Sequence, residues 1–218
     1  MSAGGRTTTA AARTTAPVDA EPGWKARPES TDYDAVRSRL VDAAESLVRE
    51  HGVAALRQDA VAERAGLSRS SVYRYFDSKD ELVVAAVVRS TLRIGQRVID
   101  GIGPDAGPEE FLVRGIVESI RAMAADPLHQ SLTTPASTTR MSRLTNTALR
   151  EGVRPLVDPV FEAAAARGAL RSGVTRDDVV NWLQVVALGL MQSPGLAGSV
   201  DEVESLLRKM LVPAVLRD

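Results

Sequence analysis

The chain has 218 residues, of which 44% are hydrophobic and 25% are charged, and its formal net charge is −1, values of an ordinary globular protein with one large or two small domains. It contains no cysteine and only two histidines, which excludes disulfides, thiolate metal sites, cysteine nucleophiles and a usual zinc site, so we expect neither a metal nor a cofactor. No apolar run approaches the length that spans a bilayer and no signal-peptide core is present, so the sequence predicts a cytoplasmic protein with no membrane partner.

Residues 1–30 consist mainly of Ala, Thr, Gly and Pro, with few large apolar side chains. Such a segment cannot bury enough apolar surface to offset the entropy of ordering it, so it is predicted to be a disordered, solvated tail. Its basic residues Arg6 and Arg13 leave open a second interpretation, in which the tail is an arm that touches DNA.

The pattern is helical almost throughout after the tail. Apolar residues recur every three or four positions over residues 36–48, which predicts an amphipathic helix that ends at Gly52. Two short helices follow, and a long helix is predicted over residues 79–100. Beyond a Gly- and Pro-rich loop at 101–108, the same pattern predicts helices at 109–125, 137–151, 153–167, 175–190 and 200–216.

Two details of this second half depend on single residues. Pro155 and Pro159 should make the start of the helix at 153–167 irregular or kinked. Thr175 is suited to cap the helix that follows the turn at 168–173, and that helix is apolar on nearly every side. No segment reads as a strand, so the fold class is predicted to be all-α.

The two short helices, at 58–65 and 69–76, are joined by Gly66-Leu67-Ser68, which is the arrangement of a DNA-binding helix-turn-helix. Gly66 fits a turn position with positive φ, and Ser68 is a typical N-cap. The outward positions of the second helix carry hydrogen-bond donors and aromatic side chains but no acid: Arg69, Ser70, Ser71, Tyr73, Arg74 and Tyr75. A helix of this kind can enter the major groove.

The run VAERAGLSRSSVYRYFDSKDEL at 61–82 resembles the signature of the TetR family of repressors. The alanine–glycine turn, the Tyr-x-Tyr-Phe ending and the lysine after it all have the family's spacing. The clear similarity covers about residues 36–88, with a weaker one at 168–182. One position departs from the family pattern: Arg57 and Gln58 stand where members have Ser or Thr followed by an apolar residue.

The resemblance implies a set of DNA contacts. These are Arg57, Ser68, Arg69, Ser70, Tyr73, Tyr75 and Lys79. Tyr73 and Lys79 match phosphate contacts, and Arg69 is a candidate for bidentate reading of a guanine. Core packing of Tyr73 and a merely solvated Arg69 are the alternatives, and Phe76 is assigned to the core.

The resemblance also implies a dimer whose subunits meet through the last two helices, and a ligand cavity among the central helices. The predicted interface residues are Trp182, Val186, Leu190, Val203, Leu207, Met210 and Leu211. The predicted pocket residues are Leu112, Ile116, Met123, Leu144 and Phe161. Ordinary core packing is the alternative for each of them.

The sequence therefore predicts an all-α, ligand-responsive transcriptional regulator with a tail at 1–30, a helix-turn-helix domain at 31–78 and an effector-binding and dimerisation domain at 79–218. We expect a repressor that binds a palindromic operator in double-stranded DNA as a homodimer and is released by an unidentified small molecule. An activator, or a DNA-binding protein without ligand control, is the alternative. An enzyme is not predicted, because the loop at 101–107 lacks the spacing of a phosphate loop and no nucleophile elbow is present.

Overall fold

A computed structural model describes residues 31–103, 105–130, 139–192 and 198–217, so the predicted tail at 1–30 lies outside the described residues. The helices of this part of the chain are α1 (Thr31–Ala55), α2 (Gln58–Arg64), α3 (Arg69–Tyr75), α4 (Lys79–Ile102), α5 (Pro108–Ala125), α6 (Pro127–Gln130), α7 (Thr139–Ala166), α8 (Arg176–Gln192), α9 (Val200–Met210) and α10 (Val212–Val215). Apart from these, one isolated antiparallel bridge joins Leu170 to Leu216. The predicted all-α class is confirmed.

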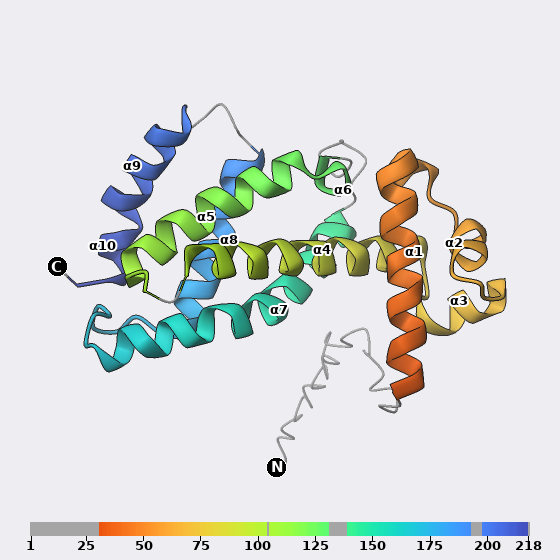
Figure 1. Cartoon of the computed structure of the whole chain (residues 1–218), viewed down its shortest axis with the longest axis horizontal. Helices are drawn as coiled ribbons and strands as arrows, with labels where there is room; N and C mark the ends of the chain where they lie inside the picture. Colours follow the sequence, from red (N-terminus) through yellow and green to blue (C-terminus); the bar gives the residue numbers. More distant parts are fainter. Residues whose placement is uncertain (1–30, 104, 131–138, 193–197, 218) are drawn as a thin grey trace, which may run out of the picture.

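The first three helices form a small unit at one end of the molecule, which we call the headpiece (residues 31–78). Helix α1 crosses the beginning of α4, and α2 and α3 lie on the side of α1 away from the rest of the chain (Figure 1). Its core is continuous with the first turns of α4 and is closed by fully buried side chains: Leu40, Val61, Val72, Phe76 and Leu82.

The remaining helices form an elongated bundle, which we call the body (residues 79–217). Helix α4 runs through it between α5 and α7, while α8 packs on α7 and α5, and α9 covers the outer part of α5 (Figure 1). A second core holds these helices together, with Val113, Val157, Val180, Leu207 and Val215 among its buried members. Among the described residues, no helix is both long and apolar enough to cross a bilayer.

Helices α4 and α7 approach each other through two glycines. A Cβ atom added at Gly152 would lie 2.6 Å from Leu92 Cδ1, and one added at Gly95 would lie 3.1 Å from Leu156 Cδ1. A larger residue at Gly152 would require the Leu92 side chain to move, so glycine suits the close approach of α4 and α7. The interface between α4 and α7 is therefore tightly closed at this crossing.

The sequence misplaced several helix boundaries. Residues predicted as two helices form the single helix α7, because Pro155 and Pro159 each remove one backbone donor while the bonds on either side remain. The predicted last helix is divided into α9 and α10, since Pro213 cannot donate the next helical hydrogen bond. Gly52, with a φ of 79° and a ψ of 163°, is non-helical and interrupts α1 where the sequence predicted the helix to end, and one short turn follows it. The short helix α6 was not predicted.

Candidate nucleic-acid interface

The helix-turn-helix has the geometry that its sequence predicts. Gly66 adopts a φ of 64°, and the Ser71 backbone N–H donates to Ser68 Oγ over 3.2 Å, so both the turn glycine and the N-cap are confirmed. Val72 and Phe76 are fully buried on the inner face of α3 and fix its angle against α2 and α1. The core role predicted for Phe76 is confirmed, and the opposite face of α3 is left to the solvent.

That outer face carries a small polar cluster around Arg69. Its Nε lies 2.9 Å from Asp59 Oδ1 on α2, and its Nη2 donates to Tyr73 Oη over 3.4 Å. The hydrogen bond that Arg69 donates to Tyr73, and then the charge of Asp59, raise the pKa of the Arg69 guanidinium. Tyr73 is 45% exposed, and Ser68 and Ser70 are also exposed. Arg69 is thus held in place by short contacts and remains open to the solvent.

The other predicted DNA contacts surround this cluster. Arg57 is exposed and gives no side-chain cap to α2, which agrees with the departure from the family pattern at this position. Lys79 Nζ donates to the Ala54 carbonyl over 3.0 Å and so ties the start of α4 to the end of α1. Tyr75 is half-buried, with its ring 4.5 Å from that of Tyr33, so it supports α1 more than it extends outward.

Polar contacts at the surface of the headpiece connect α1 and α2. Arg64 of α2 donates to Glu50 of α1 over 2.7 Å and 2.9 Å, and to Ser46 over 2.7 Å. The hydrogen bond from Arg64, followed by that from Ser46, lowers the pKa of the Glu50 carboxyl to about 2. These contacts fix α2, and through it the turn and α3, relative to α1.

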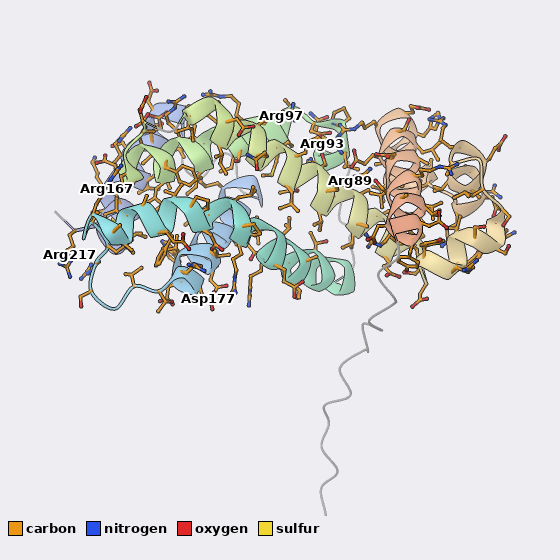
Figure 2. The ribbon with its side chains drawn as sticks, turned by 60° about the horizontal axis from the view of Figure 1, so that its bottom comes forward. Arg89, Arg93, Arg97, Arg167, Asp177 and Arg217 are labelled. Atoms are coloured by element: carbon orange, nitrogen blue, oxygen red, sulfur yellow. The ribbon has the colours of Figure 1, made fainter. Side chains whose placement is uncertain are left out.

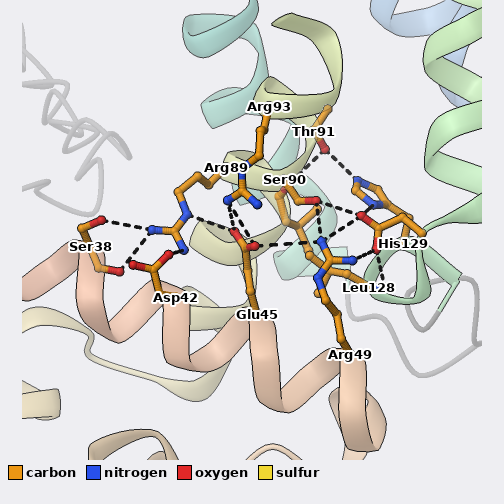
Figure 3. Close-up of polar contacts among 12 residues, drawn as sticks. Ser38, Asp42, Glu45, Arg49, Arg89, Ser90, Thr91, Arg93, Leu128 and His129 are labelled. Carbon is orange, nitrogen blue, oxygen red and sulfur yellow. Dashed lines mark hydrogen bonds and ion pairs between the residues drawn. The ribbon is translucent and has the colours of Figure 1, made fainter. Parts of the chain in front are cut away.

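A buried polar cluster joins the headpiece to the body, and we call it the joint. It consists of Glu45 and Arg49 of α1, Arg89, Ser90, Thr91 and Arg93 of α4, and Asp126 and His129 at α6 (Figure 3). Glu45 is only 5% exposed and accepts from Arg89 Nε over 2.9 Å and from Arg93 Nη2 over 3.1 Å. A buried carboxylate paired in this way would be costly to expose or to leave unpaired.

Arg49 completes the joint by reaching the body directly. It forms a two-pronged contact with the Asp126 carboxylate, and one prong is the 2.9 Å bond from Nη2 to Oδ2. Ser90 Oγ donates to the same oxygen over 3.0 Å. Although burial opposes ionisation, the bonds from Arg49 and others lower the pKa of the Asp126 carboxyl. The sequence analysis missed this cluster, whose only visible signal is the spacing of four between Arg89 and Arg93.

His129 is the buried end of the joint. Its Nε2 lies 2.9 Å from Thr91 Oγ1, and its Nδ1 has no hydrogen-bond partner among the described residues. Nδ1 lies 3.5 Å from Asp126 Oδ2. Burial lowers the pKa of His129, so the ring is neutral at physiological pH.

Three of the residues predicted to line a ligand pocket are buried in the body. Leu112, Ile116 and Met123 are buried side chains of the body, and Phe161 packs half-buried beside them, with the Arg176 guanidinium 5.6 Å above its ring. Leu144 lies in α7, but its side chain is outside the described residues. Burial is compatible both with core packing and with lining an internal pocket, so their assignment to a ligand pocket stays a prediction.

The predicted dimer residues divide into three groups. Trp182 and Met210 are 47% and 67% exposed, whereas Val186, Leu190 and Val203 are half-buried against the second core. Leu207 and Leu211 are 4% and 2% exposed. Their assignment to an interface is wrong, because they face α5 within the same chain. Two further apolar side chains of these helices, Val185 and Leu206, are 58% and 49% exposed.

Residues 40–86 match the sequence profile of the "Bacterial regulatory proteins, tetR family". The chain is 38% identical over 92 residues to the HTH-type transcriptional repressor KstR of Rhodococcus jostii, a match that covers 42% of each chain. It is 26% identical over 186 residues to the HTH-type transcriptional repressor AcnR of Corynebacterium diphtheriae, which covers 82% of this chain and 90% of AcnR. The chain spans less than half of the length of KstR, and the same holds for another relative that is 36% identical.

Among solved structures, the crystal structure of RolR in complex with resorcinol superimposes with a TM-score of 0.64 at 16% identity, covering 86% of this chain and 90% of RolR. At this identity the likeness concerns the fold. It extends through the body, where the sequence profile does not reach, so the whole described chain shares the architecture of these regulators. The matched proteins are regulators and not enzymes.

Proposed function

We propose that this chain, which belongs to the tetR family of bacterial regulatory proteins, is a repressor that binds a palindromic operator as a homodimer and releases it when a small molecule binds to the body. One observation carries the proposal. Helix α3 buries Val72 and Phe76 completely and presents Arg69, Ser70 and Tyr73 to the solvent. A helix with this division of faces, capped at its start by a serine, is suited to lie in a major groove.

The contacts of the free protein suggest separate roles for the outward side chains. Arg69 is held near the start of α3 by Asp59 and Tyr73, at the position from which a recognition helix reaches base edges. Its planar guanidinium suits the two acceptors of a guanine. We assign phosphate contacts to Lys79, Tyr73 and the free end of α3. Such contacts fix the position of the protein on DNA and carry no sequence information. Arg57, also exposed, is assigned to a phosphate beside α2.

The dimer is proposed from the exposed apolar side chains of the last helices. Trp182 and Val185 on α8, and Leu206 and Met210 on α9, are between 47% and 67% exposed. Large exposed apolar side chains on two helices of the body favour association with a second copy. Two copies would supply two headpieces, as a palindrome requires. The headpiece at 31–78 then serves DNA binding, and the rest of the chain serves dimerisation and ligand binding.

The proposal is tested by selecting DNA from a random double-stranded library with the purified protein, and then titrating the enriched sequence in salt. We expect an enriched palindrome, bound by a dimer with a strong salt dependence. Arg69→Ala should lose this selectivity. Arg217→Ala, at the far end of the body (Figure 2), removes the same charge and should retain it. Binding without any enriched sequence, equal on scrambled DNA, would contradict the proposal.

A further inference from the structure

A cavity of about 310 Å³ lies in the groove between α4 and α5, away from the crossing of α4 with α7. Its lining comes from one side of each helix: Ile94, Arg97, Val98, Gly101 and Ile102 of α4, and Arg114, Glu118 and Ala122 of α5. The volume is at the lower end of the range of small-molecule sites. None of the side chains that the sequence predicted for a ligand pocket takes part in it.

The groove combines an apolar floor with a cationic rim. Ile94 and Ile102 are buried and Val98 is half-buried, so a bound molecule would meet hydrocarbon at the bottom. Two guanidinium groups, those of Arg97 and Arg114, stand at the edge. An apolar pocket with a few charged groups at one side is typical of sites for amphipathic ligands.

The charged side chains of the groove differ in whether they are already paired within the protein. Arg114 Nε lies 3.5 Å from Glu110 Oε1, and the acid of the groove, Glu118, accepts from Arg121 over 2.7 Å. Arg97, in contrast, is exposed and has no hydrogen bond or ion pair with any described residue. The groove therefore offers one unpaired cation above a hydrocarbon floor, while its carboxylate is already occupied.

We propose that the groove between α4 and α5 binds a small amphipathic anion, with one anionic head group on Arg97 and an apolar body on Ile94, Val98 and Ile102. A carboxylate suits Arg97, because a guanidinium can donate two parallel hydrogen bonds to it. The side chains of Leu92 and Leu156 pack closely against Gly152 and Gly95 between α4 and α7, whereas the groove between α4 and α5 has space for a small molecule.

The regulatory consequence of this site rests on the proposed function, whereas ligand binding itself does not. Arg89, Arg93 and Arg97 follow one another at intervals of four along α4, from α1 toward the body (Figure 2). The first two bind Glu45 of the headpiece, and the third lines the groove. An anion bound to Arg97 lies within one helical turn of Arg93. It therefore competes with the Glu45 carboxylate for the Arg93 guanidinium. The ligand thereby loosens the joint and lowers the affinity for DNA.

Binding is tested by isothermal titration calorimetry on the full chain without DNA. The probes are sodium hexanoate, octanoate and phenylacetate, with octanol as the uncharged counterpart of octanoate. We expect at least one anion to bind with a dissociation constant below about 1 mM, and octanol to bind about ten-fold more weakly or not at all, because the charged contact is lost. If no anion binds, or octanol binds as well as octanoate, the proposal is wrong.

Three variants place the binding in this groove. Arg97→Ala should weaken the best anion about ten-fold or more, whereas Arg150→Ala, an exposed arginine of α7, should leave it unchanged. Gly101→Leu should block the cavity without unfolding the protein, because a Cβ at Gly101 meets no atom within 4 Å and leucine favours a helix. An unchanged melting temperature together with lost binding supports the site. Wild-type binding by both Arg97→Ala and Gly101→Leu would overturn it.

The effect on DNA is measured separately, with the best anion added to the protein bound to its selected sequence. A fall in affinity that Gly101→Leu abolishes supports the regulatory role. If the anion binds in the groove but leaves DNA affinity unchanged, the regulatory step is overturned while the site stands. Failure of the DNA selection itself would contradict the proposed function and would leave the calorimetric result valid.

Discussion

The headpiece and the body are both helical and both have a closed core, but they differ in what they leave exposed. The headpiece buries its large apolar side chains on α3 and presents arginine, serine and tyrosine to the solvent. The body leaves Trp182, Val185, Leu206 and Met210 exposed at 47%, 58%, 49% and 67%. The outer face of the headpiece is thus available for polar recognition, while its core is shared with the first turns of α4. We propose that a second copy of the chain covers these side chains of the body.

The largest loss of DNA affinity is expected when charges are placed among the exposed apolar side chains of the body. Val185→Asp combined with Leu206→Asp places charges where a partner would bury them, so the dimer should dissociate at micromolar concentration. The affinity for the selected palindrome should then fall about a hundred-fold or more, because the two headpieces are no longer linked. Light scattering coupled to size-exclusion chromatography gives the mass, and fluorescence anisotropy gives the affinity.

The matched control is Ala163→Asp, which adds a carboxylate to an exposed position on α7. It should remain dimeric and bind DNA like the wild type. A wild-type protein that is monomeric while it binds the palindrome tightly would contradict the comparison between the two regions.

Loss of Arg69 should have the next largest effect, and it acts through the headpiece alone. We expect Arg69→Ala to bind the selected palindrome about ten- to a hundred-fold more weakly and to lose discrimination at one base pair of each half-site, with the dimer intact. Competition among the four base substitutions at every position measures this. A uniform loss over all positions would show that Arg69 does not read a base.

The ion pair with Asp59 sharpens this test. Because Asp59 lies 2.9 Å from Arg69 in the free protein, that contact must be exchanged when Arg69 turns to a base. Asp59→Asn removes the competing charge and should strengthen binding to all DNA by a few-fold. If Asp59 instead holds Arg69 in its reading position, Asp59→Asn will reduce base discrimination, and the competition experiment distinguishes the two results.

A smaller and less selective effect is expected for Lys79. Lys79→Ala should weaken binding to every sequence alike, and the slope of log affinity against log salt concentration should decrease by about one, as for one lost phosphate contact. The Lys79 amine also donates to the Ala54 carbonyl, so the melting temperature must be compared. Lys79→Arg should restore the salt slope. An unchanged slope in Lys79→Ala would assign Lys79 to the structural contact alone.

The same contrast between the regions explains how far the sequence could be interpreted. In the headpiece, the functional features are local: Gly66 determines the turn, Ser68 caps the next helix, and Val72 and Phe76 fall on one face. Local chemistry of this kind is visible in the sequence, and all of these features were predicted correctly.

In the body, side-chain roles depend on contacts between distant segments, which periodicity does not reveal. Leu207 and Leu206 are neighbours in an apolar pattern, yet the first is 4% and the second 49% exposed, because only the first faces α5. The joint is equally invisible, since Glu45, Arg89 and Asp126 come from three separate regions of the chain. Sequence pattern thus predicted the fold class and the turn and cap of the helix-turn-helix, and it assigned the buried Leu207 and Leu211 to the interface.

The smallest predicted effect concerns acid and is confined to the surface of the headpiece. Because the pKa of Glu50 is lowered from 4.5 to about 2, its pairing with Arg64 stabilises the folded state fully above pH 4.5, and this contribution is lost as the pH falls toward 2. Glu50→Gln should therefore be less stable than the wild type in urea at pH 6, with a difference that shrinks between pH 4.5 and pH 2. Hydrogen exchange should locate the loosened amides in α1 and α2, while those of α5 and α8 remain as in the wild type. A difference that is independent of pH would show that the neutral glutamine disturbs packing and that the ion pair contributes nothing measurable, as is common for exposed pairs.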